Sequence, residues 1–537
     1  MILLYVYLLF INLCMQAELP PFLQNHSPWA EEVFKSLTLD EKIGQIMMIG
    51  VSVQNKDLFE QHKRILLDYH VGGIFIDGGY SYHTIEHQII VTNHLQNISK
   101  LPLLVGEDLE WGLTHRLADA VNLPRALTLG AIQDNSLIYE YAAEVARQCN
   151  GLGVHINASP VVDINTNPKN PIIGFRSFGD NKYHVTQKAL IFIKGLQDNN
   201  ILACAKHFTG HGDTSVDSHL DLPIVQHTRQ RLHDIELHPF KEAINAGVST
   251  IMSAHLLVNA YDTNRPATLS RAIMTDLLKH EMGFQGLAIT DALIMKAISK
   301  YISPAMANIE SFLAGNDILL YPEDIPNTVI LFKELINFRP EIEQQLNDSV
   351  LKILKAKEWL NLHNNRLAQA MSAQNINSAY AFELKKKLYA YAMTLVHDDQ
   401  CTVPVSVLEP ACLVTLGNSF EIVCDILQKS MPHLVIYNDI QKAMPALCRD
   451  TKTPIICALY ATQRGAVDQH HVHFIHELYK KNFNVITLLF GSPYVLPQLP
   501  PEVPVIVAYE EDFDAQEAAV NVLLGKRQAL GVLPITL

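Results

Sequence analysis

The segment from Lys206 to His219 reads KHFTGHGDTSVDSH and combines three histidines, two aspartates and a lysine with glycines and small hydroxyl residues. In an extended chain, residues two apart point to the same side, so Asp217 can accept a hydrogen bond from His219. A carboxylate on one imidazole nitrogen fixes the tautomer and raises the basicity of the other nitrogen. The pair therefore suits general acid/base catalysis near neutral pH.

Metal ligation is a competing interpretation of the same segment. Metal-dependent hydrolases also use barrel folds, and five residues of the segment are suitable ligands for a divalent ion: His207, His211, Asp213, Asp217 and His219. However, the chain contains no HExxH motif, and Lys206 would place a positive charge beside the ion. We therefore expect no metal and no other cofactor. A solvated loop without a role would rarely concentrate so many His and Asp residues.

Short apolar runs alternate with helical stretches through the first part of the chain, which predicts a closed parallel α/β barrel of the (β/α)8 TIM type over residues 24–365. Before the first run, Thr38 and Glu41 are spaced as a helix capping box. Polar residues close several of the runs, among them Glu107, Asp108 and Asp291. In such a barrel these strand ends share the face that carries the active site. The eight runs are residues 44–49, 72–76, 101–108, 153–163, 201–208, 248–255, 286–292 and 316–322.

A second series of apolar runs follows a polar segment, residues 366–388, which we interpret as a linker. Runs such as ACLVTLG and NVITLLFG alternate with helical segments, which predicts a C-terminal αβα sandwich domain with a mostly parallel sheet over residues 389–537. This second domain contains no phosphate-type glycine loop. Its role is not predicted by the sequence.

The N-terminus and the overall charge bear on location and partners. Residues 1–17 contain an apolar run of the length of a signal-peptide core, so we expect an exported protein, periplasmic or extracellular, with no membrane span after processing. Cys14 would be the site of a lipid anchor, but INLC lacks the small residues that such processing prefers. A net charge of -14 argues against nucleic acid as a partner.

The segment KHFTGHGDTSVDSHLDLP, Lys206 to Pro223, resembles the KHFPGHG…DSH signature of family 3 glycoside hydrolases, in the β-N-acetylglucosaminidase (β-N-acetylhexosaminidase) branch. Thr209 stands where proline is usual. LTLDEKIGQIMMIG, GGIFI and ITDALIM resemble the first helix–strand unit, the second strand and the nucleophile strand of that family, and GVLPITL is similar to the closing strand of its second domain. The resemblance implies a TIM-like barrel followed by an αβα sandwich.

The resemblance also implies roles for individual residues. Asp291 would be the nucleophile and His219 the acid/base, oriented by Asp217, in a retaining exo-β-N-acetylhexosaminidase acting on a carbohydrate with terminal β-linked N-acetylglucosamine (GlcNAc), from peptidoglycan or related glycans. Asp163 is interpreted as a structural residue that holds a loop, and His255 receives no role. The implied substrate-binding residues are Asp108, Arg116, Arg176, Lys206 and His207.

Three other functions stay open from the sequence. A β-N-acetylglucosaminide phosphorylase is the nearest, since a neutral imidazole repels incoming phosphate less than a carboxylate would. A metal-dependent barrel hydrolase would lose activity to chelators. For a non-catalytic sugar-binding protein, replacing Asp291 with asparagine would leave turnover unchanged.

Overall fold

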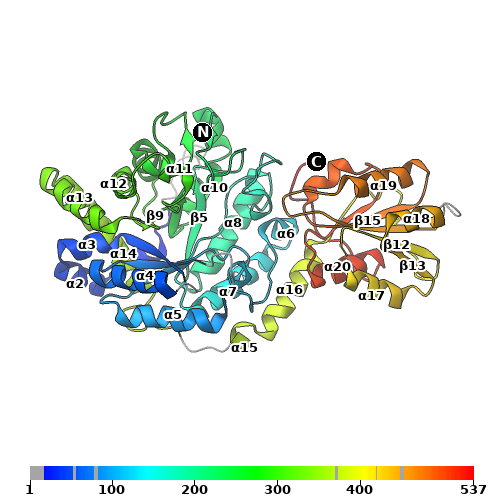
Figure 1. The fold of residues 1–537 in the computed structure, drawn as a ribbon, viewed down its shortest axis with the longest axis horizontal. Coiled ribbons are helices and arrows are strands. Elements are labelled where there is room, and N and C mark those ends of the chain that lie inside the picture. The colour runs from blue at the N-terminus through cyan, green and yellow to red at the C-terminus, as the bar shows by residue number, and fades with distance from the viewer. Residues whose placement is uncertain (1–16, 53–55, 78–82, 369–372, 419, 448–452) are drawn as a thin grey trace, which may run out of the picture.

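The computed structural model describes residues 17–537 apart from residues 53–55, 78–82, 369–372, 419 and 448–452. Most of the expected signal peptide, including Cys14, lies outside the described residues, so the leader, export and lipid anchor stay predictions. Within the described ranges, no helix is both long and apolar enough to cross a membrane. Figure 1 shows a larger N-terminal body, blue to green, beside a smaller C-terminal body, orange to red.

The N-terminal body is built around an eight-stranded parallel sheet in the order β10-β1-β2-β3-β4-β5-β7-β9. A bridge between Ile289 and Ile318 joins the last strand to the segment before the first, and thereby brings the two edges of the sheet together. The fold-class prediction is confirmed, because each of the eight predicted runs contributes one strand. These strands are β1 (Met47–Ser52), β2 (Gly73–Asp77), β3 (Leu104–Glu107), β4 (Ile156–Asn157), β5 (Leu202–Phe208), β7 (Thr250–Ser253), β9 (Leu287–Thr290) and β10 (Leu319–Leu320).

Helices surround this barrel because both faces of a parallel sheet must be covered. The capping box predicted at Thr38 and Glu41 is present at the start of α3. A two-stranded ribbon of β6 (Ile224–Val225) and β8 (Leu257–Val258) lies outside the barrel sheet. The barrel helices are α2 (Pro28–Ser36), α3 (Leu39–Gln45), α4 (Lys56–Tyr69), α5 (Ile85–Ile98), α6 (Ala126–Ala131), α7 (Asn135–Leu152), α8 (Lys182–Gln197), α9 (Arg229–Asp234), α10 (His238–Asn245), the π-helix η5 (Ala272–Glu281), α11 (Lys296–Ser299), α12 (Pro304–Ala314), α13 (Ile325–Phe338) and α14 (Glu341–Trp359).

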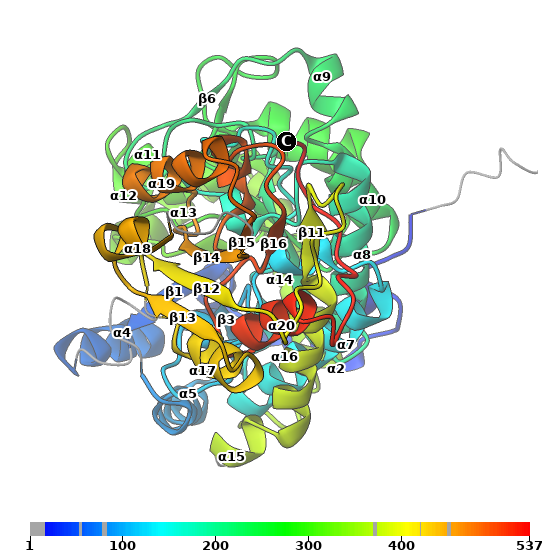
Figure 2. The ribbon, with the colours of Figure 1, turned by 90° about the vertical axis from the view of Figure 1, so that its right-hand side faces the viewer.

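The C-terminal body is the predicted sandwich with a mostly parallel sheet, in the order β11-β16-β15-β14-β12-β13. Figure 2 shows α18 and α19 on one side of this sheet and α17 and α20 on the other. The edge strand β11, which the sequence did not predict, runs antiparallel to β16. The elements are β11 (Thr394–Val396), β12 (Ala411–Leu416), β13 (Leu434–Tyr437), β14 (Ile455–Tyr460), β15 (Val485–Phe490), β16 (Val505–Val507), α17 (Glu421–Ser430), α18 (Ile440–Leu447), α19 (Gln469–Lys480) and α20 (Phe513–Leu523).

The expectation that GVLPITL forms a closing strand is wrong, since residues 531–537 form no strand. The segment instead packs on the barrel, where the Val532 N–H donates to the Ala131 carbonyl at 3.0 Å and the Asp180 N–H donates to the Pro534 carbonyl at 3.2 Å. Gly179 permits this approach: a Cβ on it would lie 2.1 Å from the Pro534 oxygen. The barrel thus satisfies the Val532 N–H and the Pro534 carbonyl, which a strand would pair within the sheet.

The two bodies also meet through α16 (Ala379–Ala392), which contacts α6 and α7 of the barrel and α20 of the sandwich. The predicted linker, residues 366–388, contains α15 (Ala373–Ile376) and the first part of α16, and its boundaries remain predictions. Beside α16, the buried Glu510 carboxylate accepts hydrogen bonds from the Arg125 backbone at 2.9 Å, the Arg125 guanidinium at 2.8 Å and the Thr128 hydroxyl at 2.6 Å. One carboxylate of the second domain therefore satisfies three donors of the first.

Replacing Glu510 with glutamine should destabilise the protein by about 2–4 kcal/mol, because an amide leaves the Arg125 charge and one of the buried donors without their acceptor. The midpoint of thermal unfolding measures the loss. Glu517→Gln is the matched control, since Glu517 is exposed on α20 and should leave the midpoint unchanged. Equal midpoints for the Glu510 variant and the wild type would contradict this role for Glu510.

Candidate active site

A cavity of about 230 Å³ opens at the carboxyl ends of the barrel strands. Asp108 follows β3, Lys206 and His207 belong to the last residues of β5, and Asp291 follows β9. Asp217, the remaining predicted catalytic residue, does not line the cavity but contacts His219. The predicted residues that do line it are Asp108, Arg116, Arg176, Lys206, His207, His219 and Asp291.

A network of alternating charges forms one side of the cavity. The buried Lys206 ammonium lies 2.7 Å from Asp108 Oδ1 and 2.8 Å from Glu110 Oε1. The Arg116 guanidinium donates to the other oxygen of Asp108 at 2.7 Å. Arg176 donates to both oxygens of Glu110, at 2.9 and 2.7 Å. Each carboxylate thus pairs with two cations. Such pairing compensates for the cost of burying so many charges away from water.

The pairing fixes the ionisation of the network. Burial acts to raise the pKa of Asp108, but Lys206 and Arg116 outweigh it and hold that pKa below its usual range. Burial likewise acts on Glu110, whose pKa is held well below the usual value by Arg176 and Lys206. For Lys206, burial acts to lower the pKa, and the two carboxylates reverse that effect. All these groups are therefore charged at neutral pH.

Glu110 is the member of this network that sequence reasoning missed. It lies in the segment EDLEWG, two residues after Asp108, and its spacing was the available signal. Its position is fixed locally, because its backbone N–H donates to His115 Nδ1 at 3.3 Å. The ring of Trp111 in turn stacks on His115 with 3.6 Å between ring centroids.

His207 is oriented by Asp163, which the sequence interpretation assigned only to holding a loop. Asp163 does hold a loop, since it accepts the His211 backbone N–H at 2.7 Å, but it also contacts His207 Nδ1 at 2.7 Å. The Arg176 guanidinium lies 3.3 Å from the other ring nitrogen. Both ring nitrogens of His207 are thus engaged, Nδ1 by Asp163 and Nε2 by Arg176.

Asp291 stands at the opposite wall, where β9 ends. Its own N–H donates to the Ser253 carbonyl at 3.0 Å, and the Ala292 N–H donates to its carboxylate at 2.8 Å. Burial acts to raise the pKa of Asp291, and the nearby imidazoles of His255 and His207 together with the Ala292 N–H outweigh burial, so the pKa lies below its usual value. His255 is buried and donates from Nε2 to the Ala292 carbonyl at 3.0 Å, which fixes the backbone beside Asp291.

The predicted pair of Asp217 and His219 is formed. His219 Nδ1 and its backbone N–H contact the same oxygen of Asp217, at 2.9 and 2.8 Å. The His219 side chain is 62% exposed although it lines the cavity, because it is carried on the loop after β5. The loop is anchored at its start by Asn170, which donates to the His211 carbonyl at 2.8 Å, and at its end by the Lys300 ammonium, which donates to the Leu220 carbonyl at 2.7 Å.

No group of three or more His, Cys, Asp or Glu side chains in the described ranges is arranged to hold a metal ion. The ligands that the metal interpretation would use are engaged elsewhere. Asp213 contacts His227 at 2.5 Å, and His211 contacts the Thr214 and Ser218 hydroxyls at 2.6 and 3.1 Å. Burial lowers the pKa of His211 to about 4, so it serves as a neutral hydrogen-bonding group within the loop.

Comparison with known proteins gives the same family on sequence and on structure. Residues 38–356 match the model of the glycosyl hydrolase family 3 N-terminal domain. The chain is 35% identical over 363 residues to beta-hexosaminidase A of Pseudoalteromonas piscicida, covering 62% of this chain and 60% of that protein. It is 25% identical over 393 residues to a beta-N-acetylglucosaminidase/beta-glucosidase of Cellulomonas fimi, covering 70% of this chain and 68% of that protein. This chain therefore spans less than two thirds of the length of the Pseudoalteromonas relative.

A solved structure matches both bodies. It is a family 3 β-N-acetylglucosaminidase from a Paenibacillus species, and it superposes with a TM-score of 0.78 at 26% identity. The match covers 93% of this chain and 99% of that structure.

Behind the charged network, Glu107 extends into the barrel and is fully buried. One of its oxygens accepts from Gln88 at 2.6 Å, and Gln88 in turn contacts His83 at 2.6 Å. The other oxygen has no hydrogen-bond partner among the described residues. Burial raises the pKa of Glu107 to about 8, so this carboxyl group is protonated at neutral pH although its neighbour Asp108 is ionised.

Because the pKa of Glu107 is raised by folding, the unfolded chain releases this proton first, and stability should fall as pH rises from about 4.5 to about 8. Glu107→Gln replaces the protonated acid with a neutral group of the same shape. The variant should match the wild type near pH 4 and exceed it by about 1–3 kcal/mol above pH 8. Urea unfolding across this pH range tests it, with the exposed Glu86→Gln as control. A pH-independent difference would contradict the assignment.

Proposed function

The chain belongs to glycosyl hydrolase family 3, and on this premise we propose that it is a retaining exo-β-N-acetylhexosaminidase that releases terminal β-linked GlcNAc from peptidoglycan-derived or related glycans. The observation that carries the proposal is that Asp291, with a lowered pKa, and His219, paired with Asp217, line one cavity. The preference for GlcNAc rests on the resemblance of the DSH segment and on the names of the similar proteins.

The glycone would bind against the charged network. A sugar presents several hydroxyl groups, and charged donors and acceptors bind them with hydrogen bonds stronger than neutral ones. Lys206, Arg116 and Arg176 supply donors, and Asp108 supplies acceptor sites. Because these groups already hold one another in place, little side-chain entropy is lost when the sugar binds.

The reaction would proceed in two steps. In the first, His219 donates a proton to the glycosidic oxygen while the Asp291 carboxylate attacks the anomeric carbon, so that the aglycone leaves and a glycosyl ester forms. In the second, His219 takes a proton from a water molecule that attacks the same carbon and releases Asp291. Two displacements at one carbon retain its configuration. Asp217 stabilises the imidazolium form of His219 during the cycle.

Hydrolysis is favoured over phosphorolysis by the electrostatics of the cavity. A phosphate acceptor needs a cation that is not already neutralised. Lys206, Arg116 and Arg176 all lie within ion-pair distance of Asp108 or Glu110. Asp291 adds a third carboxylate to the same cavity, so an incoming phosphate would meet no excess of these cations over carboxylates. Export through the N-terminal leader is part of the same proposal, since a periplasmic or extracellular enzyme would meet such glycans.

Replacing Asp291 with asparagine should lower turnover of a chromogenic β-GlcNAc glycoside more than about 1,000-fold, because the amide cannot form the glycosyl ester. Asp276→Asn, an exposed carboxylate on η5, is the matched control and should retain full activity. The wild type should hydrolyse the GlcNAc glycoside faster than a β-glucoside, and EDTA should not change its activity. When phosphate is present, the product should be free GlcNAc rather than a sugar phosphate. Unchanged turnover in the Asp291 variant would favour a non-catalytic sugar-binding protein.

His219→Gln should slow the cleavage of aglycones that need protonation by about 100-fold or more, and slow an activated nitrophenyl aglycone far less. Asp217→Asn removes the counter-charge of the imidazolium, so the alkaline limb of the kcat/KM profile should move to lower pH. The control Asp213→Asn changes the other Asp–His pair of the same loop and should leave that limb in place. An unaltered profile in the Asp217 variant would show that Asp217 does not act on the proton donor.

A further inference from the structure

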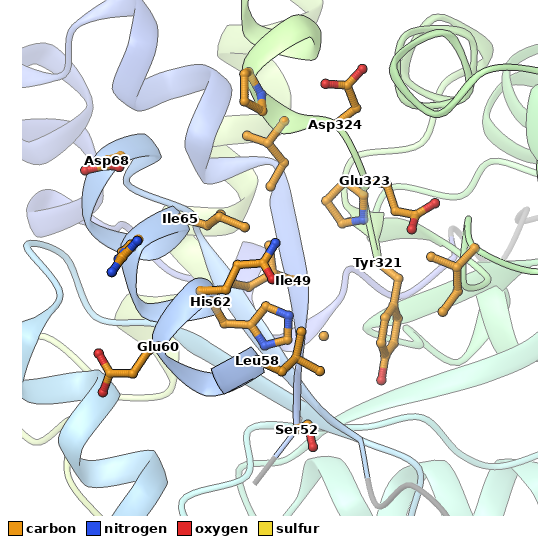
Figure 3. A pocket seen from close by; sticks show the side chains of 17 residues that line it. Ile49, Ser52, Leu58, Glu60, His62, Ile65, Asp68, Tyr321, Glu323 and Asp324 are labelled. Atoms are coloured by element: carbon orange, nitrogen blue, oxygen red, sulfur yellow. The ribbon is translucent and has the colours of Figure 1, made fainter. Parts of the chain in front are cut away.

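The second domain contributes no described side chain to the cavity of the candidate active site, which barrel residues between Phe75 and Tyr321 line. The same holds for a larger cleft of about 800 Å³, where α4 lies across from Tyr321 and Glu323 (Figure 3). A structural effect of the second domain on the site must therefore pass through barrel residues. The contacts between the two domains show which residues these are.

Arg176, one of the cations of the charged network, ends the three-residue 3-10 helix η3 (Gly174–Arg176). Two backbone hydrogen bonds form this element, from Arg176 to Ile173 at 2.8 Å and from Ser177 to Gly174 at 3.2 Å. Gly174 has a φ angle of 43°, and a Cβ on it would meet no atom within 4 Å. Because a glycine in open space restrains the backbone little, the position of η3 depends on contacts from outside it.

The buried Asn165, in the segment after β4, supplies one such contact. Its Oδ1 accepts the Gly174 N–H at 3.1 Å, and its own N–H donates to the Gly179 carbonyl at 3.0 Å. Its Nδ2 donates to the hydroxyl group of Tyr494, a residue of the second domain, at 2.6 Å. Since the Gly174 N–H can only donate, Oδ1 must face it and Nδ2 must face Tyr494. The Tyr494 hydroxyl therefore fixes the orientation of the Asn165 amide.

Tyr494 is itself held by the second domain. It lies in the 3-10 helix η6 (Pro493–Gln498), which follows β15, and its N–H donates to the Ser492 hydroxyl at 3.4 Å. Burial raises the pKa of Tyr494 to about 12, so its hydroxyl group is neutral at physiological pH. The sheet of the second domain thus presents a neutral acceptor to Asn165.

A second contact from the same domain reaches η3 at Phe175. The Arg125 guanidinium lies 5.4 Å from the centroid of the Phe175 ring and 5.2 Å from that of the Trp111 ring, within the range of cation–π attraction. Arg125 in turn pairs with Glu510 of the second domain at 2.8 Å. Two of the three residues of η3 are therefore supported through the second domain, and the third is Arg176.

We infer that the second domain positions Arg176 for binding of the glycone, and that Tyr494 is a positioning residue that acts through Asn165. The inference rests on the proposed function, in which Arg176 donates to a sugar hydroxyl. Without the Tyr494 hydroxyl, the Asn165 amide can rotate and turn its NH2 group toward the Gly174 N–H. Two donors cannot bond, so Gly174 would lose its acceptor and η3 would shift together with Arg176.

Replacing Tyr494 with phenylalanine tests the inference, because only the hydroxyl group is removed. The KM for a chromogenic β-GlcNAc glycoside should rise about fivefold, the effect of one neutral hydrogen bond, whereas kcat should change less than about twofold. Tyr509→Phe is the matched control, since it removes a buried hydroxyl group that bonds to Thr394 within the second domain at 2.8 Å. It should lower the midpoint of thermal unfolding and leave KM unchanged.

A coupling measurement shows whether the effect passes through Arg176. Arg176→Lys keeps the charge but loses the two-pronged contact with Glu110, and it should raise KM by itself. In that background Tyr494→Phe should add less than about twofold, because the guanidinium that Tyr494 positions is already absent. Asn165→Ala should raise KM as Tyr494→Phe does, and the double variant should raise it no further.

An unchanged KM in the Tyr494 variant overturns the inference, and so does a full fivefold rise in the Arg176→Lys background. If the Tyr494 variant fails to fold, the unchanged KM of Asn165→Ala overturns the inference instead. Failure of the proposed function would look different, because the wild type itself would then not cleave the glycoside.

Discussion

The site depends on the burial of one ammonium group. Lys206 is almost completely removed from water, and a charge in that position is tolerated only where carboxylates surround it. Asp108 and Glu110 provide this environment, but two carboxylates on a single lysine would leave excess negative charge, and Arg116 and Arg176 each pair with one of them. The need to pair each buried charge with an opposite one therefore brings together β3, β5 and the loops that carry the two arginines. A hydroxyl-rich ligand finds donors and acceptors that are already oriented.

The reacting groups that we propose differ in how they are supported. Asp291 is held by its backbone hydrogen bond to Ser253 of β7 and lies near buried imidazoles, so the barrel determines its position and its ionisation. His219 is held by its neighbour Asp217 on a loop and is largely exposed. The barrel therefore holds Asp291 in one position, whereas the loop can change the distance between His219 and the substrate.

Much of this could be predicted from the sequence, and the reasons for the misses are physical. The eight barrel strands are buried on both sides and therefore stand out as apolar runs, whereas β11 has three residues and pairs on one edge only. The DSH pair is local, two residues apart, and its hydrogen bond followed from spacing. The contact of Asp163 with His207 spans 44 residues, and no pattern in either segment announces it. The role of Glu110 could not be predicted from the residues around it, because its partners Lys206 and Arg176 lie far away in the chain.

The contact between residues 532–536 and the corner at Gly179 and Asp180 links the second domain to the folding of the first. Thr536 donates to the Asp180 carboxylate across 356 residues of sequence, and Arg176 lies four residues before that corner. Contacts of such separation form late in folding, because a long loop must close before they are made. During vectorial synthesis the barrel can assemble its strands early, but this corner gains its contacts with residues 532–536 only after those residues have been made. Residues 532–536 therefore couple the final packing of this corner of the barrel to the synthesis of the segment that follows the sandwich sheet.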